Sequence, residues 1–433
     1  MGTRAESSSV SYEAFRSKSE ALERFHLRRR RQRYLNVFLL ATTLLLINLI
    51  VFYVVDQTRA LPSHPAPAQT FCYFGYDEND HSLQPENING TLCDHIIFGF
   101  AAIENNKLVP RGKGDNRDEI WRRTVKLKER FPHLSVMISI GAPAAQFSAT
   151  TSNETSLRTL VESAVQIIQK YEFNGLDIDW EFPAWGGMPI ADQENFISLL
   201  RELRKAFDDS TIFGNRNHLL LTTAVAAPIT IVQTSYKVPD MALYLDYCLL
   251  MGYDFNRFNK LVPLVEFNSP LHRHTGQVSF LAMLNIAEAS ELWVQKGMPR
   301  EKLVVGMPFY GVTFKLADRN RVEVGSPAKA VGLYGGSLTY ARMCALLEEG
   351  DWTVVFHNES RVPYAYRGDD WITFENPQSI QEKTQWVLDQ KYAGIMTFDL
   401  NYDDVNRTCK TSKENFPLQT IVFQAVKSLK PVR

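Results

Sequence analysis

Three acidic residues alternate with apolar residues in the segment FNGLDIDWEFP, residues 173–183. Asp177, Asp179 and Glu181 occupy every second position, so in an extended strand their side chains point to one face. Carboxyl groups packed together in a confined space raise at least one pKa and favour sharing of protons. A carboxyl that stays protonated near neutral pH can act as a general acid. The segment therefore predicts acid–base chemistry, with Glu181 as the acid and the two aspartates as its proton partners.

The same spacing also fits an edge strand whose acidic face is solvated and has no chemical role. The elements around the segment decide between these interpretations. After residue 70, short apolar runs alternate with amphipathic helical patterns. The strand candidates are FCYF, HIIFGFAAI, LSVMISIG, FNGLDIDWEF, HLLLTTAVAA, YLDYCLLMGYD, KLVVGMPFYG and AGIMTFDL.

Continuously apolar strands that alternate with helices are typical of a parallel sheet covered on its outside. Eight such units predict a (β/α)8 TIM barrel, in which both faces of the fourth strand are buried and the solvated-edge interpretation fails. The three acids then point inward, with Glu181 nearest the carboxyl end, where barrel enzymes place their chemistry. The chain exceeds the usual barrel length of about 250 residues, and we expect an insertion at about residues 312–376.

The amino-terminal part has a different composition. Residues 1–33 form a polar tail that ends in the basic cluster HLRRRRQR, and residues 34–55 form an apolar run without charged residues. A helix of that length spans about 33 Å, enough to cross a bilayer. The alternatives are a cleaved signal peptide and, for the arginines, nucleic-acid or nucleotide binding; the long tail and long apolar core favour an uncleaved signal anchor.

The positive-inside rule places this basic tail in the cytosol and everything after residue 55 outside the cell or in a lumen. The sequence therefore predicts a single-pass type II membrane protein with a Pro-rich stem at residues 56–70 and one folded domain at 71–430. A formal net charge of −1 gives no reason to expect nucleic acid as a partner. We expect a monomer.

Cysteines and glycosylation sequons agree with an extracellular or lumenal domain. The four sequon asparagines all follow the predicted span: Asn89, Asn153, Asn358 and Asn406. The five cysteines also follow it and form no metal-binding pattern, so we expect no metal and no cofactor. Two disulfides and one buried free thiol are the simplest count, with Cys248 as the odd residue because it lies in an apolar strand pattern.

Several of these motifs together resemble family 18 of the glycoside hydrolases, the chitinases and chitinase-like lectins. FNGLDIDWEFP resembles the DxxDxDxE signature of that family, and LLMGYDF resembles its MxYD motif, with Met251, Tyr253 and Asp254. VGMPFYG and VPYAYRGDDWITFEN resemble its seventh strand and the end of its α+β insertion domain. The segments around CYF, LCDHIIFGFA and MTFDLNYDDVNRTC are also similar, and they imply disulfides Cys72–Cys93 and Cys344–Cys409.

The resemblance implies retaining, substrate-assisted hydrolysis of β-1,4-linked N-acetylglucosamine in chitin or its oligosaccharides. Glu181 would protonate the glycosidic oxygen, Asp179 would orient the acetamido group of the sugar, and Asp177 would share the proton of Asp179. Tyr253 would hydrogen-bond the acetamide oxygen. The remaining residues that we expect at the substrate are Asp254, Met251, Tyr73, Phe398, Trp185 and Tyr310.

The sequence departs from the family at several positions. Asn174 replaces the first acid of the signature, and an amide cannot carry charge. Pro143 and Phe398 stand where the family has tryptophans, and phenylalanine offers less stacking area than indole. Trp185 could supply a replacement contact or could pack in its loop against the insertion. We therefore expect weak action on crystalline chitin and better action on short or soluble oligomers.

Two other functions are compatible with these motifs. Chitinase-like lectins bind glycans without cleaving them, but such proteins usually lack the glutamate that Glu181 provides here. An endo-β-N-acetylglucosaminidase acting on N-glycans would share the same signature. The sequence favours a hydrolase and does not choose the glycan.

Overall fold

The fold is described by a computed structural model that covers residues 67–76, 83–112, 117–209 and 218–428, with scattered residues between 29 and 46. The chain divides into two units, Met1–Pro65 and Ala66–Arg433. The predicted tail, membrane span and stem lie largely outside the described residues. Of the span at 34–55, residues 35–36, 38–40, 42–43 and 46 are described, and they are helical. Within the described part of the chain, no helix is both long and apolar enough to cross a membrane.

Eight parallel strands close into a barrel in the second unit. They pair in the order β1-β15-β8-β7-β6-β5-β4-β2, and pairing of β1 with β2 closes the ring. The strands are β1 (Gln69–Gly75), β2 (His95–Glu104), β4 (Ser135–Gly141), β5 (Gly175–Asp179), β6 (Leu220–Val225), β7 (Tyr247–Leu250), β8 (Leu303–Pro308) and β15 (Gly394–Phe398). All eight apolar runs of the sequence therefore form barrel strands.

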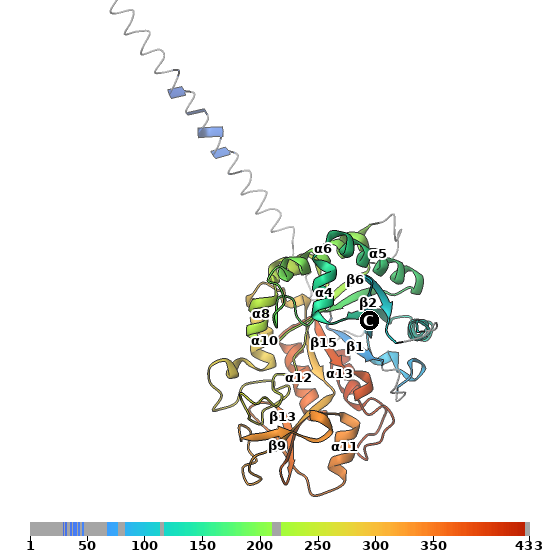
Figure 1. The fold of residues 1–433 in the computed structure, drawn as a ribbon, viewed down its shortest axis with the longest axis vertical. Coiled ribbons are helices and arrows are strands. Elements are labelled where there is room, and N and C mark those ends of the chain that lie inside the picture. Colours follow the sequence, from blue (N-terminus) through green and yellow to red (C-terminus); the bar gives the residue numbers. More distant parts are fainter. Residues whose placement is uncertain are drawn as a thin grey trace, which may run out of the picture. The chain divides into compact units, whose positions relative to one another are not determined.

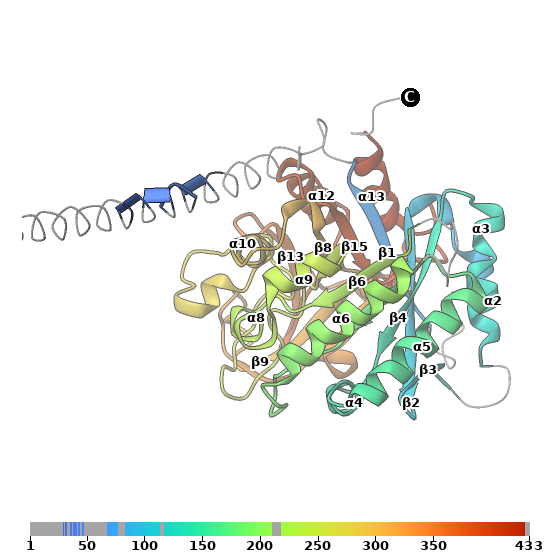
Figure 2. The ribbon, with the colours of Figure 1, turned by 90° about the horizontal axis from the view of Figure 1, so that it is seen from above.

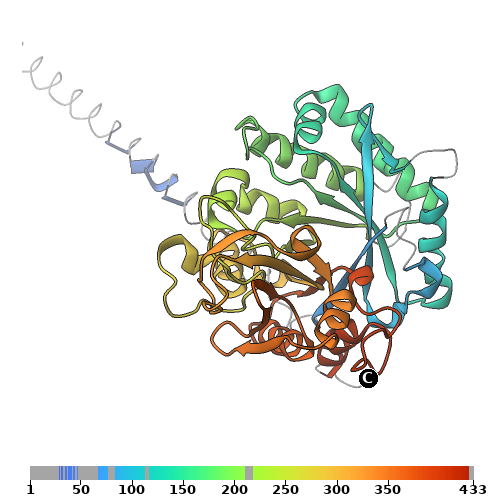
Figure 3. The same cartoon turned by 60° about the horizontal axis from the view of Figure 1, so that its bottom comes forward.

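Helices cover the outside of this barrel (Figure 1). Figure 2 shows α5 and α6 along the outer side of the strands, and Figure 3 shows helices around the strands from another direction. The helices of the barrel layer are α2 (Glu119–Val125), α3 (Leu127–Arg130), α4 (Ala144–Thr151), α5 (Glu154–Tyr171), α6 (Asp192–Asp208), α8 (Ile229–Ser235), α9 (Val238–Tyr244), α10 (Ile286–Gln295), α12 (Pro377–Asp389) and α13 (Pro417–Ser428).

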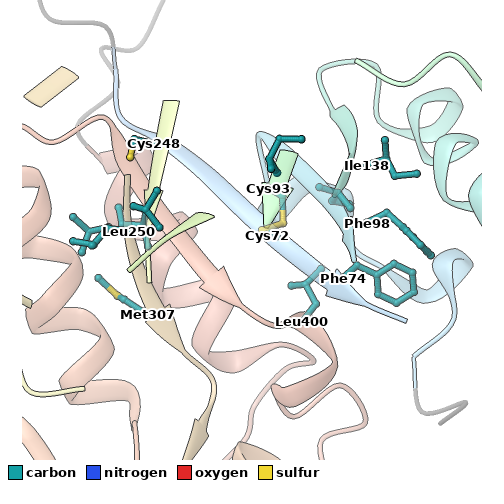
Figure 4. Packing of buried hydrophobic residues seen from close by; sticks show 14 of the residues in the cluster. Cys72, Phe74, Cys93, Phe98, Ile138, Cys248, Leu250, Met307 and Leu400 are labelled. Carbon is teal, nitrogen blue, oxygen red and sulfur yellow. A yellow bond between two sulfur atoms is a disulfide. The ribbon is translucent and has the colours of Figure 1, made fainter. Parts of the chain in front are cut away.

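Neighbouring residues of one strand belong to two different layers of the core. On β1, Phe71 and Tyr73 pack inside the barrel, whereas Cys72 and Phe74 pack between the strands and the helices. Figure 4 shows Phe74 in this outer layer. Because side chains alternate along a strand and both faces are buried, the barrel strands are apolar along their whole length.

An antiparallel sheet lies between β8 and β15 in the chain. It pairs in the order β10-β9-β14-β13-β12, with β11 against β9. Its strands and helix are β9 (Tyr310–Leu316), β10 (Ala328–Val331), β11 (Ser337–Thr339), α11 (Tyr340–Glu348), β12 (Thr353–His357), β13 (Val362–Arg367) and β14 (Asp370–Thr373). Strands β9 and β13 and helix α11 gather at one end of Figure 1. Since β9 begins one residue after Phe309, the insertion starts directly at the carboxyl end of β8.

Two disulfides tie segments of the chain together, in the pairing that the resemblance implied. Cys72 of β1 is joined to Cys93, just before β2, and Figure 4 shows this pair in the outer core. Cys344 of α11 is joined to Cys409, in the segment that follows β15. Cys248 is a buried free thiol on β7. The second disulfide therefore connects the insertion to the carboxyl-terminal part of the barrel.

Candidate active site

The three acids of the signature lie at increasing height along β5 and the residues that follow it. Asp177 is fully buried, Asp179 at the end of the strand is half-buried, and Glu181 is solvent-accessible beyond it. The apolar residues between them face the other way, and Trp180 stacks on Phe147 of α4 at a ring distance of 5.1 Å. Alternation along the strand thus sends the acids inward and brings Glu181 alone to the mouth of the barrel.

Asp177 is held by three hydroxyl groups. Tyr73 and Ser139 each donate a 2.6 Å hydrogen bond to Oδ2, and Thr222 donates one of 2.6 Å to Oδ1. Burial raises the pKa of Asp177, although the three hydrogen bonds oppose that increase. These donors come from β1, β4 and β6, so the carboxyl group is held in the interior of the barrel.

The carboxyl groups of Asp179 and Glu181 influence each other's protonation. Burial raises the pKa of Asp179 well above its ordinary value, and the negative charges of Glu181 and Asp177 raise it further. Reduced hydration in the cavity also raises the pKa of Glu181, and the charge of Asp254 adds to this effect. Each carboxyl group affects the other, because Glu181 raises the pKa of Asp179 and Asp179 lowers that of Glu181. The pair therefore keeps at least one proton at pH values where an isolated carboxyl is ionised.

A cavity of about 500 Å³ opens above these acids at the carboxyl end of the barrel. Most of the residues expected at the substrate contribute to it. The lining consists of Tyr73, Phe100, Arg111, Gly141, Ala142, Pro143, Asp179, Glu181, Ala224, Met251, Tyr253, Asp254, Arg257, Tyr310, Ser337, Phe398 and Tyr402. Its volume suits a small number of sugar rings.

Aromatic rings form one wall of this cavity around Phe398. Its ring centroid lies 5.5 Å from that of Tyr73, 5.8 Å from that of Tyr253 and 6.2 Å from that of Tyr402. Burial, as the largest cause, raises the pKa of Tyr253 well above its ordinary value, so its hydroxyl stays protonated and can donate a hydrogen bond. The wall therefore combines apolar faces with a phenolic donor beside the acids.

Asp254 is fixed by two neighbours rather than free in the cavity. Tyr310 of β9 donates a 2.7 Å hydrogen bond to its Oδ1, and Arg257 forms a 2.8 Å ion pair with the same oxygen. The Arg257 guanidinium also lies 5.8 Å from the centre of the Tyr310 ring. Tyr310 belongs to the insertion, so the insertion helps to position an acid of the barrel.

Two residues singled out from the sequence lie elsewhere. Trp185 follows β5 but does not line the cavity; its side chain is 37% exposed. Asn174 lies at the opposite, amino end of β5, where its Oδ1 accepts a 2.9 Å hydrogen bond from the main-chain N–H of Val136. The departure from the family at residue 174 is therefore remote from the mouth of the barrel.

Eight further lining residues were not singled out from the sequence: Phe100, Arg111, Gly141, Ala142, Ala224, Arg257, Ser337 and Tyr402. Arg111 reaches the cavity from the segment after β3 (Lys107–Pro110), a strand that pairs antiparallel with β2. The pair Asn105–Asn106, which separates the two strands, is a signal for this hairpin in the sequence. In the structure both residues have positive φ. Two such residues are typical of a tight type I′ turn.

The described residues contain no group of three or more His, Cys, Asp or Glu side chains that could hold a metal ion. The titratable groups that line the cavity are carboxyl groups, phenols and guanidinium groups. A protonated carboxyl beside a phenol suits proton donation to a leaving oxygen.

Comparison with known proteins identifies the family. Residues 69–403 match the family described as "Glycosyl hydrolases family 18". The chain belongs to this family. Chitotriosidase-1 of Mus musculus is 33% identical over 325 residues, which cover 74% of this chain and 69% of that protein.

Solved structures of this family include both enzymes and binding proteins. The structure of the Ostrinia furnacalis group IV chitinase in complex with allosamidin superposes with a TM-score of 0.76 at 28% identity, covering 83% of this chain and 99% of the other. Human YKL-39 superposes with a TM-score of 0.77 at 28% identity, covering 83% and 100%, and is described as a pseudo-chitinase with retained chitooligosaccharide binding. Family membership alone therefore does not separate hydrolysis from binding.

Proposed function

We propose that this family 18 protein hydrolyses β-1,4 linkages of N-acetylglucosamine within chitin oligosaccharides, with retention of configuration. The observation that carries the proposal is that Asp179 and Glu181 line one cavity together with Tyr253, in surroundings that raise the pKa of both acids. A protein that only binds glycans would have no need of a second acid at the mouth of the cavity beside Asp179. The similarity to Chitotriosidase-1 and to the Ostrinia furnacalis chitinase supports the same substrate class.

The reaction would run in two steps. Glu181 gives its proton to the glycosidic oxygen while the acetamido oxygen of the substrate attacks the anomeric carbon, so the bond to the leaving sugar breaks and an oxazolinium ion forms. Asp179 orients the acetamido group and stabilises the positive charge, and Tyr253 hydrogen-bonds the acetamide oxygen. Water then attacks the anomeric carbon and gives a proton to Glu181, which restores the acid.

The test is removal of the acid with its shape preserved. Glu181→Gln keeps the size and hydrogen-bonding capacity of the side chain but cannot donate the proton, so hydrolysis of chitotetraose should fall at least about 100-fold. Its affinity for the sugar should change little. The matched control is Glu162→Gln on α5, which replaces a solvent-exposed glutamate of the helical layer. Retention predicts that the first product carries the β configuration, which proton NMR detects.

The second candidate is a glycan-binding protein without turnover. The specific observation in its favour is the reduced aromatic surface, with Pro143 and Phe398 at the cavity instead of tryptophans. If wild-type protein binds chitotetraose and cleaves it no faster than Glu181→Gln, this candidate replaces the hydrolase. A mass assay on a high-mannose glycopeptide separates both from an endo-β-N-acetylglucosaminidase.

We also propose that the catalytic domain lies outside the cell or in a secretory lumen, anchored by the apolar run at residues 34–55. Exposure of all four sequon asparagines, Asn89, Asn153, Asn358 and Asn406, supports this arrangement. Treatment of the expressed protein with an N-glycosidase should increase its electrophoretic mobility. A protein without any such change would contradict the topology, and soluble protein that begins near residue 61 would indicate cleavage instead of anchoring.

A further inference from the structure

Two arginines line the cavity on either side of the acids. Arg111 contacts Phe100 of β2 and the end of β4, whereas Arg257 follows β7 and contacts Tyr310 beyond β8. The order β8-β7-β6-β5-β4-β2 places β5, which carries Asp179 and leads to Glu181, between these two groups of strands. Any glycan placed across the acids therefore has a guanidinium within the cavity on each side.

The position of Arg111 depends on specific contacts. Its Nη2 donates a hydrogen bond to the main-chain oxygen of Gly141, and its guanidinium carbon lies 5.3 Å from the centre of the Phe100 ring. A Cβ at residue 141 would stand 2.7 Å from the Phe100 ring and 3.2 Å from Nη2 of Arg111. Only glycine allows this approach, so the guanidinium is held against the end of β4.

Arg111 has donors to spare. A guanidinium carries five N–H groups, and the hydrogen bond to Gly141 uses one of them. Among the residues that the structure describes, Arg111 forms no ion pair. Arg257 differs, because its Nη2 is paired with Asp254 at 2.8 Å. The charge of Arg111 acts on Asp179, but the two groups form no close ion pair. Arg111 is therefore the guanidinium better able to bind a further anion.

The charges of the lining also permit an anion. Asp179, Glu181 and Asp254 would repel a negative group if they stood alone. The proton kept by the Asp179–Glu181 pair and the two guanidinium groups together offset these three carboxylates. A negative substituent on a bound sugar can thus approach Arg111 without net repulsion from the cavity.

This lining offers a neutral chitin chain little aromatic surface for stacking. Its N-acetylglucosamine rings bind by stacking on large aromatic faces, and Pro143 and Phe398 supply less of that surface than indole would. A guanidinium instead presents a planar pair of donors that matches a carboxylate or a sulfate.

We propose that the substrate is an N-acetylglucosamine-containing glycan that carries an anionic group, a carboxylate or a sulfate, on a sugar next to the one cleaved, and that Arg111 binds this group. The inference rests on the proposed function and specifies its substrate class. Glu181 still acts on the glycosidic bond of an N-acetylglucosamine, so the reaction itself is unchanged.

Binding measured without turnover tests the inference. The full chain carrying Glu181→Gln is titrated by calorimetry with chitotetraose, with its 6-O-sulfated form, and with a tetrasaccharide that alternates glucuronate and N-acetylglucosamine. At least one anionic sugar should bind about tenfold more tightly than chitotetraose, as a charge-assisted hydrogen bond provides. The anionic sugar that binds more tightly shows whether the site prefers a sulfate or a carboxylate. Higher salt should weaken this preference, because salt screens accessible charges.

Variants at Arg111 assign the preference to its side chain. Arg111→Gln should remove most of the gain, and Arg111→Lys, which keeps the charge but loses the planar fork, should retain part of it. The control Arg158→Gln changes an exposed arginine of α5 and should keep the preference. Equal affinity for neutral and anionic sugars, or a preference that survives Arg111→Gln, would overturn the inference.

Failure of the inference can be told from failure of the proposed function. Hydrolysis of chitotetraose by wild-type protein, lost in Glu181→Gln, supports the hydrolase whatever the charge preference. If that hydrolysis occurs and no anionic sugar binds more tightly, only the inference fails. If none of the three tetrasaccharides binds, both fail.

Discussion

Asn174 accepts a 2.9 Å hydrogen bond from the main-chain N–H of Val136, and this bond joins the amino end of β5 to β4. Carboxylates do the same at two other strands: Asp94 before β2 accepts from Thr70, and Asp246 before β7 accepts from the N–H of Leu221. The side chain at residue 174 therefore stabilises the barrel at the amino ends of its strands. It lies three residues from Asp177, about 10 Å along an extended strand, so its missing charge is remote from the catalytic pair.

This placement predicts that Asn174→Asp will change turnover less than about twofold, because the effect of a partly exposed charge at this distance is small. Asn174→Ala should instead lower the free energy of unfolding by about 1–3 kcal/mol, since the Val136 N–H loses its acceptor. Steady-state kinetics and thermal unfolding of the two variants separate these effects. A tenfold gain in turnover for Asn174→Asp would mean that the first acid of the signature does reach the catalytic pair.

The pH dependence of turnover should report the charge of Asp254. Reduced hydration raises the pKa of Glu181, and the negative charge of Asp254 raises it further. The proton-donating form of Glu181 is lost as the pH rises through this pKa, which sets the alkaline limb of kcat/KM. Asp254→Asn removes the charge, so the pKa of Glu181 should fall and the limb should move to lower pH.

The control for this prediction is Asp240→Asn, which neutralises an exposed acid at α9 and should leave the limb in place. We also expect Asp254→Asn to lower kcat/KM by about tenfold or more, because Arg257 loses its charged partner and Tyr310 its anionic acceptor. A limb that stays at the same pH in Asp254→Asn would mean that the charge of Asp254 does not affect the pKa of Glu181.

The sequence predicts those features whose pattern lies within one segment of the chain. Each barrel strand is a continuous apolar run, so the strands and the inward face of Asp177, Asp179 and Glu181 follow from alternation alone. Arg111 could not be placed in this way. Its position depends on contacts with Phe100 and Gly141, which belong to two other strands.

Loop residues show the same limit. Trp185 follows the signature directly, yet it lies outside the cavity lining, whereas Tyr310 and Tyr402, from distant segments, both line it. Their rings lie 6.0 Å apart at an interplanar angle of 82°. Proximity in sequence to a catalytic residue therefore says little about a loop side chain, because the path of the loop is fixed by tertiary contacts.

A larger ring at residue 398 should strengthen sugar binding. Phe398 is half-buried, and its ring contacts Tyr73, Tyr253 and Tyr402 on the cavity wall. Phe398→Trp adds aromatic area for stacking, so chitotetraose should bind more tightly by about 0.5–1.5 kcal/mol. Calorimetry with the Glu181→Gln protein as background measures this without turnover.

The control for Phe398→Trp is Phe423→Trp on α13, which enlarges a ring outside the cavity lining. It should leave the affinity for chitotetraose unchanged. Weaker binding by Phe398→Trp, with the fold intact by circular dichroism, would mean that the neighbouring tyrosines leave no room for an indole and that phenylalanine is the ring that fits this wall.

Asp403 makes the stability of the fold depend on pH. It is buried behind β15 and accepts hydrogen bonds from the main-chain N–H groups of Asp404, Leu418 and Gln419, the last two at the start of α13. Burial raises its pKa to about 7 in spite of these bonds. In the unfolded chain the carboxyl ionises near 3.8. Between these values the folded state holds the extra proton, so the stabilising contribution is present at low pH and is lost as the pH rises to about 7.

The measurement compares wild type with Asp403→Asn, which has no proton to lose. As the pH rises from about 4 to about 7, the free energy of unfolding of wild type should fall relative to that of Asp403→Asn, by at most about 1.4 kcal/mol per pH unit. Asp404→Asn provides a control of opposite sign. Burial raises the pKa of Asp404, but its hydrogen-bond donors, which include Thr408 and the main-chain N–H of Cys409, outweigh burial and lower the pKa. Wild type should therefore become more stable relative to that variant as the pH rises from low values. Urea unfolding at several pH values distinguishes the two, and equal slopes would contradict the assignment of the raised pKa to Asp403.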